Sequence, residues 1–207
     1  MRLRYVLAAV LLAAVAASAR AQVGVYINPV VEHIGNSTAD TGPFAFFGDG
    51  QRSGIFGGLD FGAYYDVTHG PGMKFGVDAR DTIVHRNNAS LNVFSLAARI
   101  ESRPTAFGFR PYAELSAGAA VSKAPVSLVH TLQGQYALYG GIDYPLNRHV
   151  DFRVIEVGIG SVTTTNSYIN AGQKPAIGAS GLVHISSGLV FRFGVPGGPP
   201  KKPKNPY

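Results

Sequence analysis

The sequence contains no cysteine and few charged side chains. Without cysteine, the chain can form neither a disulfide framework nor a thiolate zinc site. Charged residues make up 14% of its 207 residues, and no apolar run with helical spacing follows residue 21. The chain is long enough for one domain with a substantial core, but amphipathic helices do not build that core.

The formal charge of +6 lies at the two ends of the chain and not in its body. Residues 1–21 and 195–207 contain no acidic residue, and they hold six of the 18 basic ones: Arg2, Arg4, Arg20, Lys201, Lys202 and Lys204. The body between them therefore carries 12 basic and 12 acidic residues. A neutral body offers no basic stripe for phosphates, so we expect no nucleic-acid partner.

Residues 1–21 predict a cleaved secretory signal peptide. Two arginines near the start are followed by an unbroken apolar run over residues 6–17, and Ala19 and Ala21 supply a small–x–small cleavage site. The run is shorter than the roughly 20 residues that a membrane-spanning helix needs, which favours a signal peptide over an anchor. At the other end, residues 195–207 are rich in proline, glycine and lysine and predict a disordered tail.

Between these ends, residues 22–194 alternate between apolar and polar side chains in segments of about ten residues. Turn-rich stretches separate the segments, and most have the length of a tilted transmembrane strand. Eight segments are predicted: residues 23–31, 55–67, 74–83, 92–100, 111–121, 135–144, 152–160 and 183–193. The pattern predicts an all-β protein, an eight-stranded antiparallel up-and-down barrel.

One face of each segment is apolar, and the opposite face is small or polar. Leu59, Phe61 and Tyr65 share one face of the second segment, whereas Asp60 and Asp66 lie on the other. The charged residues assigned in this way form a predicted lumen network: Asp60, Asp66, Lys74, Asp78, Arg80, Arg99, Glu114, Asp143 and Arg192. In the seventh segment, placing Glu156 inside leaves Arg153 outside, near a rim.

Charge pairing indicates which face points inward. If the two hairpins are symmetric about residues 70 and 106, Asp60 lies opposite Arg80, Asp66 opposite Lys74, and Arg99 opposite Glu114. An unpaired buried charge costs several kcal/mol, so such pairs are what a narrow charged lumen requires. A polar interior with an apolar exterior is an inside-out protein, and lipid is its natural solvent.

The lengths of the connections predict which end faces outward. Those after the second, fourth and sixth segments are tight, whereas residues 35–52 and 163–181 form the longest ones. Outer-membrane barrels have short periplasmic turns and longer external loops, so we expect outer-membrane localisation with both termini in the periplasm. An aromatic girdle at the periplasmic rim would then comprise Tyr65, Phe75, Tyr144 and Phe193.

Three stretches resemble one known family, the outer membrane protein A-like and opacity-type eight-stranded barrels of Gram-negative bacteria. Residues 140–153 (GGIDYPLNRHVDFR) are similar to their sixth strand, turn and seventh strand, and residues 110–114 (RPYAE) to the start of their fifth. Residues 186–193 resemble the closing-strand signal read by the barrel-assembly machinery, through Ser186, Gly188, Phe191 and Phe193. The resemblance implies outer-membrane lipids and that machinery as partners, and no cofactor.

The leading functional hypothesis is a non-enzymatic structural or adhesive protein that acts through its external loops. Phe46, Phe47 and Tyr168 lie in the first and last of these loops, where they could anchor a surface ligand or pack the loop itself. The lumen of an eight-stranded barrel is just wide enough for side chains to fill, which favours a packed network over a pore. The alternative is a secreted soluble barrel that binds a small apolar ligand, with its apolar face inside.

A third and weaker hypothesis is an enzyme that modifies lipid A. His184 and Ser186 resemble the His-x-Ser of outer-membrane lipid A deacylases, but they lie on the predicted interior face with Arg192, and no acid follows. We therefore expect no catalytic residue. The six histidines are scattered with no pair at ligand spacing, so we expect no metal site either.

We predict that the mature chain begins at Gln22. Intact-mass measurement of protein purified from membranes should match residues 22–207, because signal peptidase cuts after the small residue Ala21. An Ala19→Arg, Ala21→Arg double variant should retain the leader. A mature protein that still carries residues 1–21 would contradict the prediction.

Overall fold

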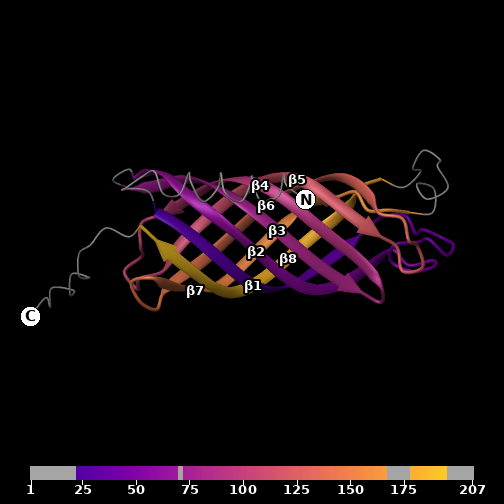
Figure 1. The fold of residues 1–207 in the computed structure, drawn as a ribbon, viewed down its shortest axis with the longest axis horizontal. Helices are drawn as coiled ribbons and strands as arrows, with labels where there is room; N and C mark the ends of the chain where they lie inside the picture. Colours follow the sequence, from indigo (N-terminus) through magenta and orange to yellow (C-terminus); the bar gives the residue numbers. More distant parts are fainter. Residues whose placement is uncertain (1–21, 70–71, 167–177, 195–207) are drawn as a thin grey trace, which may run out of the picture.

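A computed structural model describes residues 22–69, 72–166 and 178–194 as a closed barrel of eight antiparallel strands (Figure 1). The predicted signal peptide, the predicted tail and Tyr168 lie outside the described residues. The strands are β1 (Gln22–Gly35), β2 (Ser53–His69), β3 (Met73–Arg86), β4 (Ala89–Ser102), β5 (Arg110–Lys123), β6 (Thr131–Pro145), β7 (Val150–Val162) and β8 (Ser180–Phe193). The described residues include no helix that could cross a membrane.

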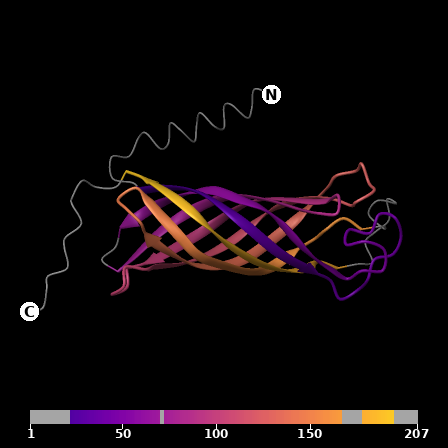
Figure 2. The ribbon, with the colours of Figure 1, turned by 90° about the horizontal axis from the view of Figure 1, so that it is seen from below.

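Each strand pairs with its neighbours in the chain, and β1 pairs with β8 to close the barrel. Val23 lies opposite Phe193, so both ends of the barrel sequence lie at one end, here called the terminal end. The opposite end, here called the loop end, carries the long connection of residues 36–52 (Figures 1 and 2). Even strand number and short turns at the terminal end agree with the predicted architecture.

The strands are longer than the sequence pattern indicates, mainly at the loop end. β1 continues to Gly35, four residues beyond its predicted end, and β2 begins two residues early at Ser53. In this region the inward side chains are apolar, as Ile34 and Val84 are, and both are fully buried. The outward side chains there include His33, His85 and Ser90, so the rule that apolar residues face outward and polar residues inward no longer holds at this end of the strands.

The register of the β2–β3 hairpin corrects one predicted pairing. Arg80 lies opposite Gly62 and not opposite Asp60, which faces Thr82 instead. The register shifts between Asp66 and Thr68, so the hairpin is not symmetric about residue 70.

The charges predicted to meet in this hairpin still lie within 4 Å of each other, as diagonal neighbours. The distances are 3.6 Å for Arg80 with Asp60 and 3.6 Å for Lys74 with Asp66. In the next hairpin, Arg99 faces Glu114 directly, as expected.

A second irregularity overturns the prediction that Arg153 points outward. The register between β7 and β8 shifts between Arg153 and Glu156, and both side chains are completely buried inside the barrel. The two residues between them, Val154 and Ile155, are both exposed on the outer wall. A bulge therefore breaks the strict alternation and lets two charges three residues apart share the lumen.

The wall of the barrel is inside out. Leu96 on β4 and Ile55 on β2 are 61% and 64% exposed, whereas Arg80 and Arg153 are at most 2% exposed. Phe75, Tyr144 and Phe193 are exposed at the terminal end, where the sequence predicts an aromatic rim. A soluble barrel that binds an apolar ligand requires the reverse distribution, and the charged interior does not fit it.

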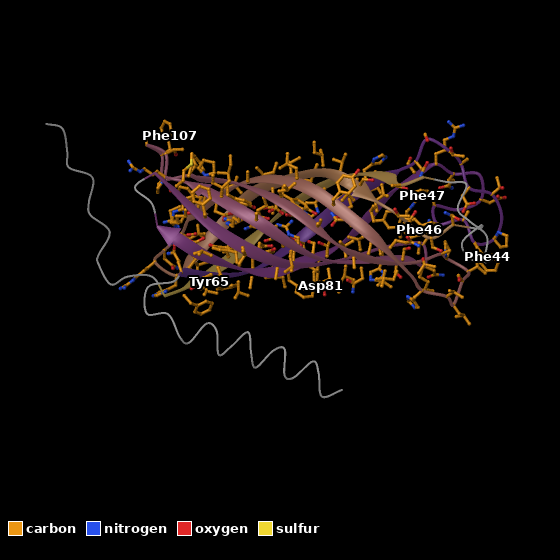
Figure 3. All side chains as sticks on the ribbon, turned by 90° about the horizontal axis from the view of Figure 1, so that it is seen from above. Phe44, Phe46, Phe47, Tyr65, Asp81 and Phe107 are labelled. Carbon is orange, nitrogen blue, oxygen red and sulfur yellow. The ribbon has the colours of Figure 1, made fainter. Side chains whose placement is uncertain are left out.

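Asp81 interrupts the apolar part of this outer wall. It lies on the outward face of β3 between Phe61 of β2 and Phe94 of β4, both exposed (Figure 3). Its Oδ1 atom has no hydrogen-bond partner among the described residues. A carboxylate in an apolar wall is destabilising in lipid, although less so than an arginine or lysine.

We predict that Asp81→Val stabilises the barrel in phospholipid vesicles by about 1–2 kcal/mol, because the carboxylate no longer has to be placed in hydrocarbon. Urea unfolding measures the change. Thr82→Val is the matched control: Thr82 points inward and donates a hydrogen bond of 2.9 Å to Asp60, so its loss should destabilise the barrel. A lower unfolding midpoint for Asp81→Val would show that the carboxylate has a stabilising partner.

Candidate functional site

Three arginines occupy the middle of the lumen, and carboxylates surround each of them. Arg80 projects inward from β3, with Nη1 2.7 Å from Glu156 Oε1 and Nη2 2.9 Å from Glu114 Oε2. Asp60 and Asp78 lie 3.6 Å and 3.8 Å from the same guanidinium. The carboxylates come from β2, β3, β5 and β7, so this one side chain connects opposite sides of the barrel.

The other two arginines extend the same network. Arg99 of β4 pairs with Glu114 and lies 3.5 Å from Asp143. Arg153 of β7 lies 3.1 Å from Asp143 and 3.2 Å from Glu156. Glu114, Asp143 and Glu156 are thus each shared by two arginines, which makes the network continuous.

Tyrosine rings pack against the arginines. Each guanidinium lies over two rings, at 3.8–5.6 Å from the ring centroids: Arg80 over Tyr26 and Tyr139, Arg99 over Tyr64 and Tyr112, Arg153 over Tyr26 and Tyr112. Cation–π contacts of this kind are worth up to about 2 kcal/mol when desolvated. The rings fill the space that the ion pairs leave.

A glycine lies directly across from each of these four tyrosines. The cross-strand pairs are Tyr26 with Gly62, Tyr64 with Gly24, Tyr112 with Gly141, and Tyr139 with Gly158. A Cβ atom at any of these glycines would approach the facing ring to between 2.2 and 2.5 Å, closer than real Cβ atoms come. The small residues on the inner face therefore have a function: they make room for the rings.

All nine residues of the predicted lumen network point into the barrel. Eight are buried, and Lys74 at the terminal end retains 27% of its side-chain exposure. Asp66 and Lys74 pair there, Glu101 joins Lys74 to Arg99, and Arg192 pairs with Asp151 at 2.8 Å. The network is thus a central cluster that extends toward the terminal end.

Seven residues outside the predicted set also join the network: Glu32, Glu101, Arg110, Asp151, Arg153, Glu156 and His184. The sequence had already placed Glu156 and His184 on the interior face, without assigning them to the network. Glu32 lies one residue beyond the predicted end of its strand and an even number of residues from Tyr26, so it shares the inward face of Tyr26. Extending the alternation by one residue would have predicted its position. Glu101 and Arg110 were assigned to a turn, and they become strand residues because the strands are longer than predicted. Arg153 had no sequence signal, because its bulge leaves none.

His184 and Ser186 are both inside the barrel and buried. His184 Nδ1 lies 3.0 Å from Glu32 Oε1, and its Nε2 lies 3.3 Å from Glu156 Oε1. Ser186 donates a hydrogen bond to Glu156 and not to His184. No lipid on the outer wall can reach this hydroxyl, so the arrangement does not support nucleophilic attack on lipid A.

Asp60, Glu156 and His184 offer three ligand atoms within 4.8 Å of one another, which is the spacing of a metal site. Sequence spacing gave no sign of this group, because its members come from three strands. The Arg80 guanidinium lies within 3.6 Å of both carboxylates. It already neutralises them and would repel a divalent cation, so these residues do not fit a metal.

An apolar cap closes the lumen at the loop end. The connection between β1 and β2 folds inward, and Phe46 stacks on Phe56 with ring centroids 5.2 Å apart, while Phe47 packs edge-on against Phe46. Phe46 is 2% exposed and Phe47 9% exposed. They belong to a buried cluster with inward side chains from the strand ends, among them Ile34, Val84, Leu91, Ala120, Val162 and Leu182.

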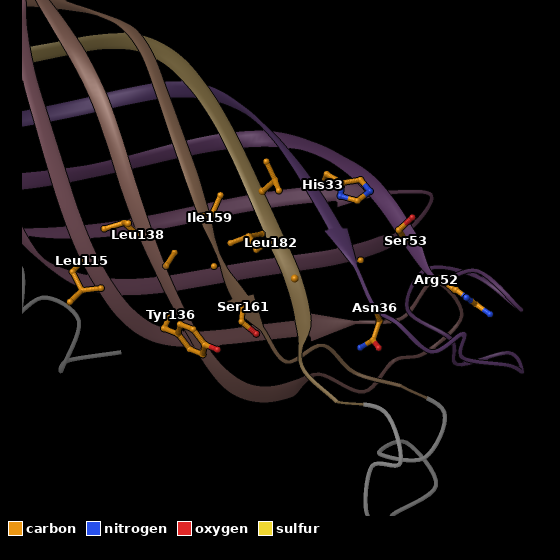
Figure 4. Close-up of a pocket in the computed structure, with 15 residues that line it drawn as sticks. His33, Asn36, Arg52, Ser53, Leu115, Tyr136, Leu138, Ile159, Ser161 and Leu182 are labelled. Atoms are coloured by element: carbon orange, nitrogen blue, oxygen red, sulfur yellow. The ribbon is translucent and has the colours of Figure 1, made fainter.

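The outer wall carries a shallow groove near the loop end, over β1, β8, β7 and β6 (Figure 4). Its volume is about 770 Å³, and its floor includes Gly35 and Gly181, which are paired across the seam of the barrel. His33 and Arg52 lie at its upper edge, and Leu138 and Ile159 line the part nearer the middle of the wall.

The residues that resemble a barrel-assembly signal divide between the two faces of β8. Ser186 points inward, and Phe191 and Phe193 point outward, 39% and 55% exposed. Gly188 lies against Asn28 of β1, where a Cβ atom would come within 2.4 Å of the Asn28 Oδ1 atom.

No family model matches this chain, and no curated protein matches it in sequence. Solved structures do share its fold. Neisserial surface protein A superposes with a TM-score of 0.56 at 12% identity, over 83% of this chain and 97% of that one. Ail, the attachment invasion locus protein of Yersinia pestis, superposes with a TM-score of 0.51 at 10% identity, over 84% of this chain and 99% of that one. The outer membrane enzyme PagL gives 0.40 at 16% identity, over 79% and 97%.

The first two likenesses establish the fold, which is that of the eight-stranded outer-membrane β-barrels. At such low identity they carry no information on ligand or activity.

We predict that Glu156→Gln destabilises the barrel by about 3–5 kcal/mol, because it removes the charge shared by Arg80 and Arg153 and leaves both less compensated. Urea unfolding in vesicles measures the loss. The exposed loop residue Asp49 is the control, since Asp49→Asn keeps an acceptor for the Gly42 amide and should change stability by less than about 0.5 kcal/mol. Equal stability of Glu156→Gln and the wild type would contradict a supporting role for the network.

Proposed function

We propose that this chain is an integral outer-membrane protein without enzymatic activity, which serves a structural or adhesive role through its external loops. The observation that carries the proposal is the inside-out wall: large apolar side chains cover the outside of a barrel whose centre is a charged network. Only a lipid environment makes this distribution favourable, because in water both faces would be poorly solvated.

The proposed orientation places both termini in the periplasm and residues 36–52 outside the cell. The two longest connections lie at the loop end, together with the tight β3–β4 turn, and the terminal end has only short ones, as in outer-membrane barrels. The exposed aromatic residues at the terminal end would lie where the outer membrane meets the water of the periplasm, a position that favours amphipathic aromatic rings. Insertion would depend on the barrel-assembly machinery reading β8, through the residues that resemble its signal.

We further propose that the lumen does not conduct. The arginine–carboxylate network fills its middle, and the aromatic cap with Phe46 and Phe47 closes it at the loop end. Ion passage would require several shared ion pairs to break at once, each at a cost of several kcal/mol.

The surface for an adhesive role is the loop end. Phe46 and Phe47 pack the loop from within and do not offer a contact surface, whereas Phe44 beside them is 39% exposed. The similar fold of a protein described as an attachment locus product supports, at the level of fold, a barrel that presents loops to a partner. The buried cap joins the β1–β2 loop to the inward side chains at the strand ends.

The proposal predicts that the protein stays in washed outer membranes after urea extraction and migrates faster on a gel before boiling than after it. In planar bilayers the purified barrel should give no sustained conductance, because its lumen is packed. Release into the soluble fraction would overturn the membrane assignment. Steady channels from a heat-modifiable barrel would overturn the packed lumen alone.

A lipid A-modifying activity has less support. The inward His184–Ser186 pair cannot reach lipid, and Ser186→Ala should leave lipid A acylation unchanged. A changed acylation pattern in that variant would show that the barrel is an enzyme.

A further inference from the structure

A row of basic and polar side chains crosses β3, β4 and β5 on the outer wall at the loop end and continues to the residue before β6. His85 of β3 lies opposite Ser90 of β4, and Ser90 lies opposite Lys123 of β5. His130 directly precedes β6 and continues the same register, because Ser122 faces Thr131. Directly opposed residues place their Cβ atoms about 5 Å apart, so the four form one continuous row.

These side chains line a polar pocket of about 620 Å³, together with Asn88 and Leu128. Asn88 stands at the tight β3–β4 turn, where it and Asn87 adopt positive φ angles. His85 and His130 are exposed, and Lys123 is half-buried. No carboxylate lines the pocket, and none of the three basic side chains pairs with one among the described residues.

The absence of local counter-charge separates this pocket from the lumen, where carboxylates surround every arginine. A lysine flanked by two histidines, with a hydroxyl and an amide beside it, offers several hydrogen-bond donors and the lysine charge to one ligand. The ligand class that this set fits is a phosphate monoester, which carries nearly two negative charges and three acceptor oxygens.

The position of the row indicates where such a phosphate comes from. The next outward row toward the middle of the wall is mostly apolar and consists of Ile83, Asn92, Val121 and Leu132. The β5–β6 connection beside the row exposes Val126, Leu128 and Val129, which are 70%, 92% and 55% exposed. Exposed apolar side chains beside a basic row fit the boundary between acyl chains and headgroups better than they fit open water.

We propose that this row, His85–Ser90–Lys123–His130, binds the phosphate monoester of a phosphorylated glycolipid in the outer leaflet. The acyl chains of the glycolipid lie against Val121 and Leu132, and the connection of residues 124–130 covers the phosphate group. The site goes beyond the loop function proposed above and rests on it only for the orientation that places the loop end outside.

The test titrates the purified full-length barrel in zwitterionic detergent, with bound lipid counted by native mass spectrometry. The probes are bisphosphorylated lipid A, its dephosphorylated form, phosphatidylglycerol and inorganic phosphate. Wild-type protein should prefer bisphosphorylated lipid A over the dephosphorylated form by about tenfold or more, because only the phosphate monoester can accept charge-assisted hydrogen bonds from the row.

The triple variant His85→Gln, Lys123→Gln, His130→Gln should lose this preference and keep the heat-dependent gel shift that reports a folded barrel. Lys123→Arg should retain it, since the charge and donors remain. The matched control is Arg52→Gln, an exposed cation at the same end that does not line the pocket, and it should bind as the wild type does.

Three outcomes would overturn the inference. Equal lipid A binding by the triple variant and the wild type would show that these residues do not bind the phosphate. An equal loss in Arg52→Gln would indicate a general charge effect. Full competition by inorganic phosphate, or a preference for phosphatidylglycerol, would assign the site to another anion or leaflet. The gel shift tests membrane insertion separately, so a failure here is distinguishable from a failure of the proposed function.

Discussion

Everything else in this barrel depends on the mutual neutralisation of Arg80, Arg99 and Arg153 with the carboxylates they share. An inside-out wall leaves the charged side chains no solvent but one another, and an isolated buried charge costs several kcal/mol. Glu114, Asp143 and Glu156 each contact two arginines, so the network is stable only as a whole. It stabilises a closed barrel rather than an open sheet, because its members come from strands on opposite sides.

The aromatic cap and the charged centre depend on each other. Phe46, Phe47 and the apolar ends of the strands separate the central ion pairs from water at the loop end, and exclusion of water strengthens electrostatic interactions. In turn, the side chains that fill the lumen give the inward-folded β1–β2 loop a surface to pack against. The polar row on the outer edge of the loop end lies on β3, β4 and β5 and on the residue before β6.

The sequence was sufficient for the fold and for most of the inward charges, because a period of two assigns a face to every residue in a regular strand. That logic placed Asp60, Arg99 and Arg192 correctly. It failed for Arg153, since a bulge changes the parity without leaving a mark in the pattern. It also missed the apolar inner layer at the loop end, where the strands carry polar side chains such as His85 and Ser90 on the outside. The meeting of His184 with Glu32 and Glu156 follows from barrel closure and cannot be read from spacing.

The tyrosine–glycine pairs have a consequence for how the strands find their alignment. A slip of two residues keeps every side chain on its proper face, so hydrophobicity alone does not forbid it. Such a slip between β1 and β2 would set Tyr26 against either Tyr64 or Asp60 instead of Gly62, and the narrow interior has no space for two phenol rings at one level. Shape thus rejects the misalignments that polarity accepts, and the glycines carry alignment information although they have no side chain.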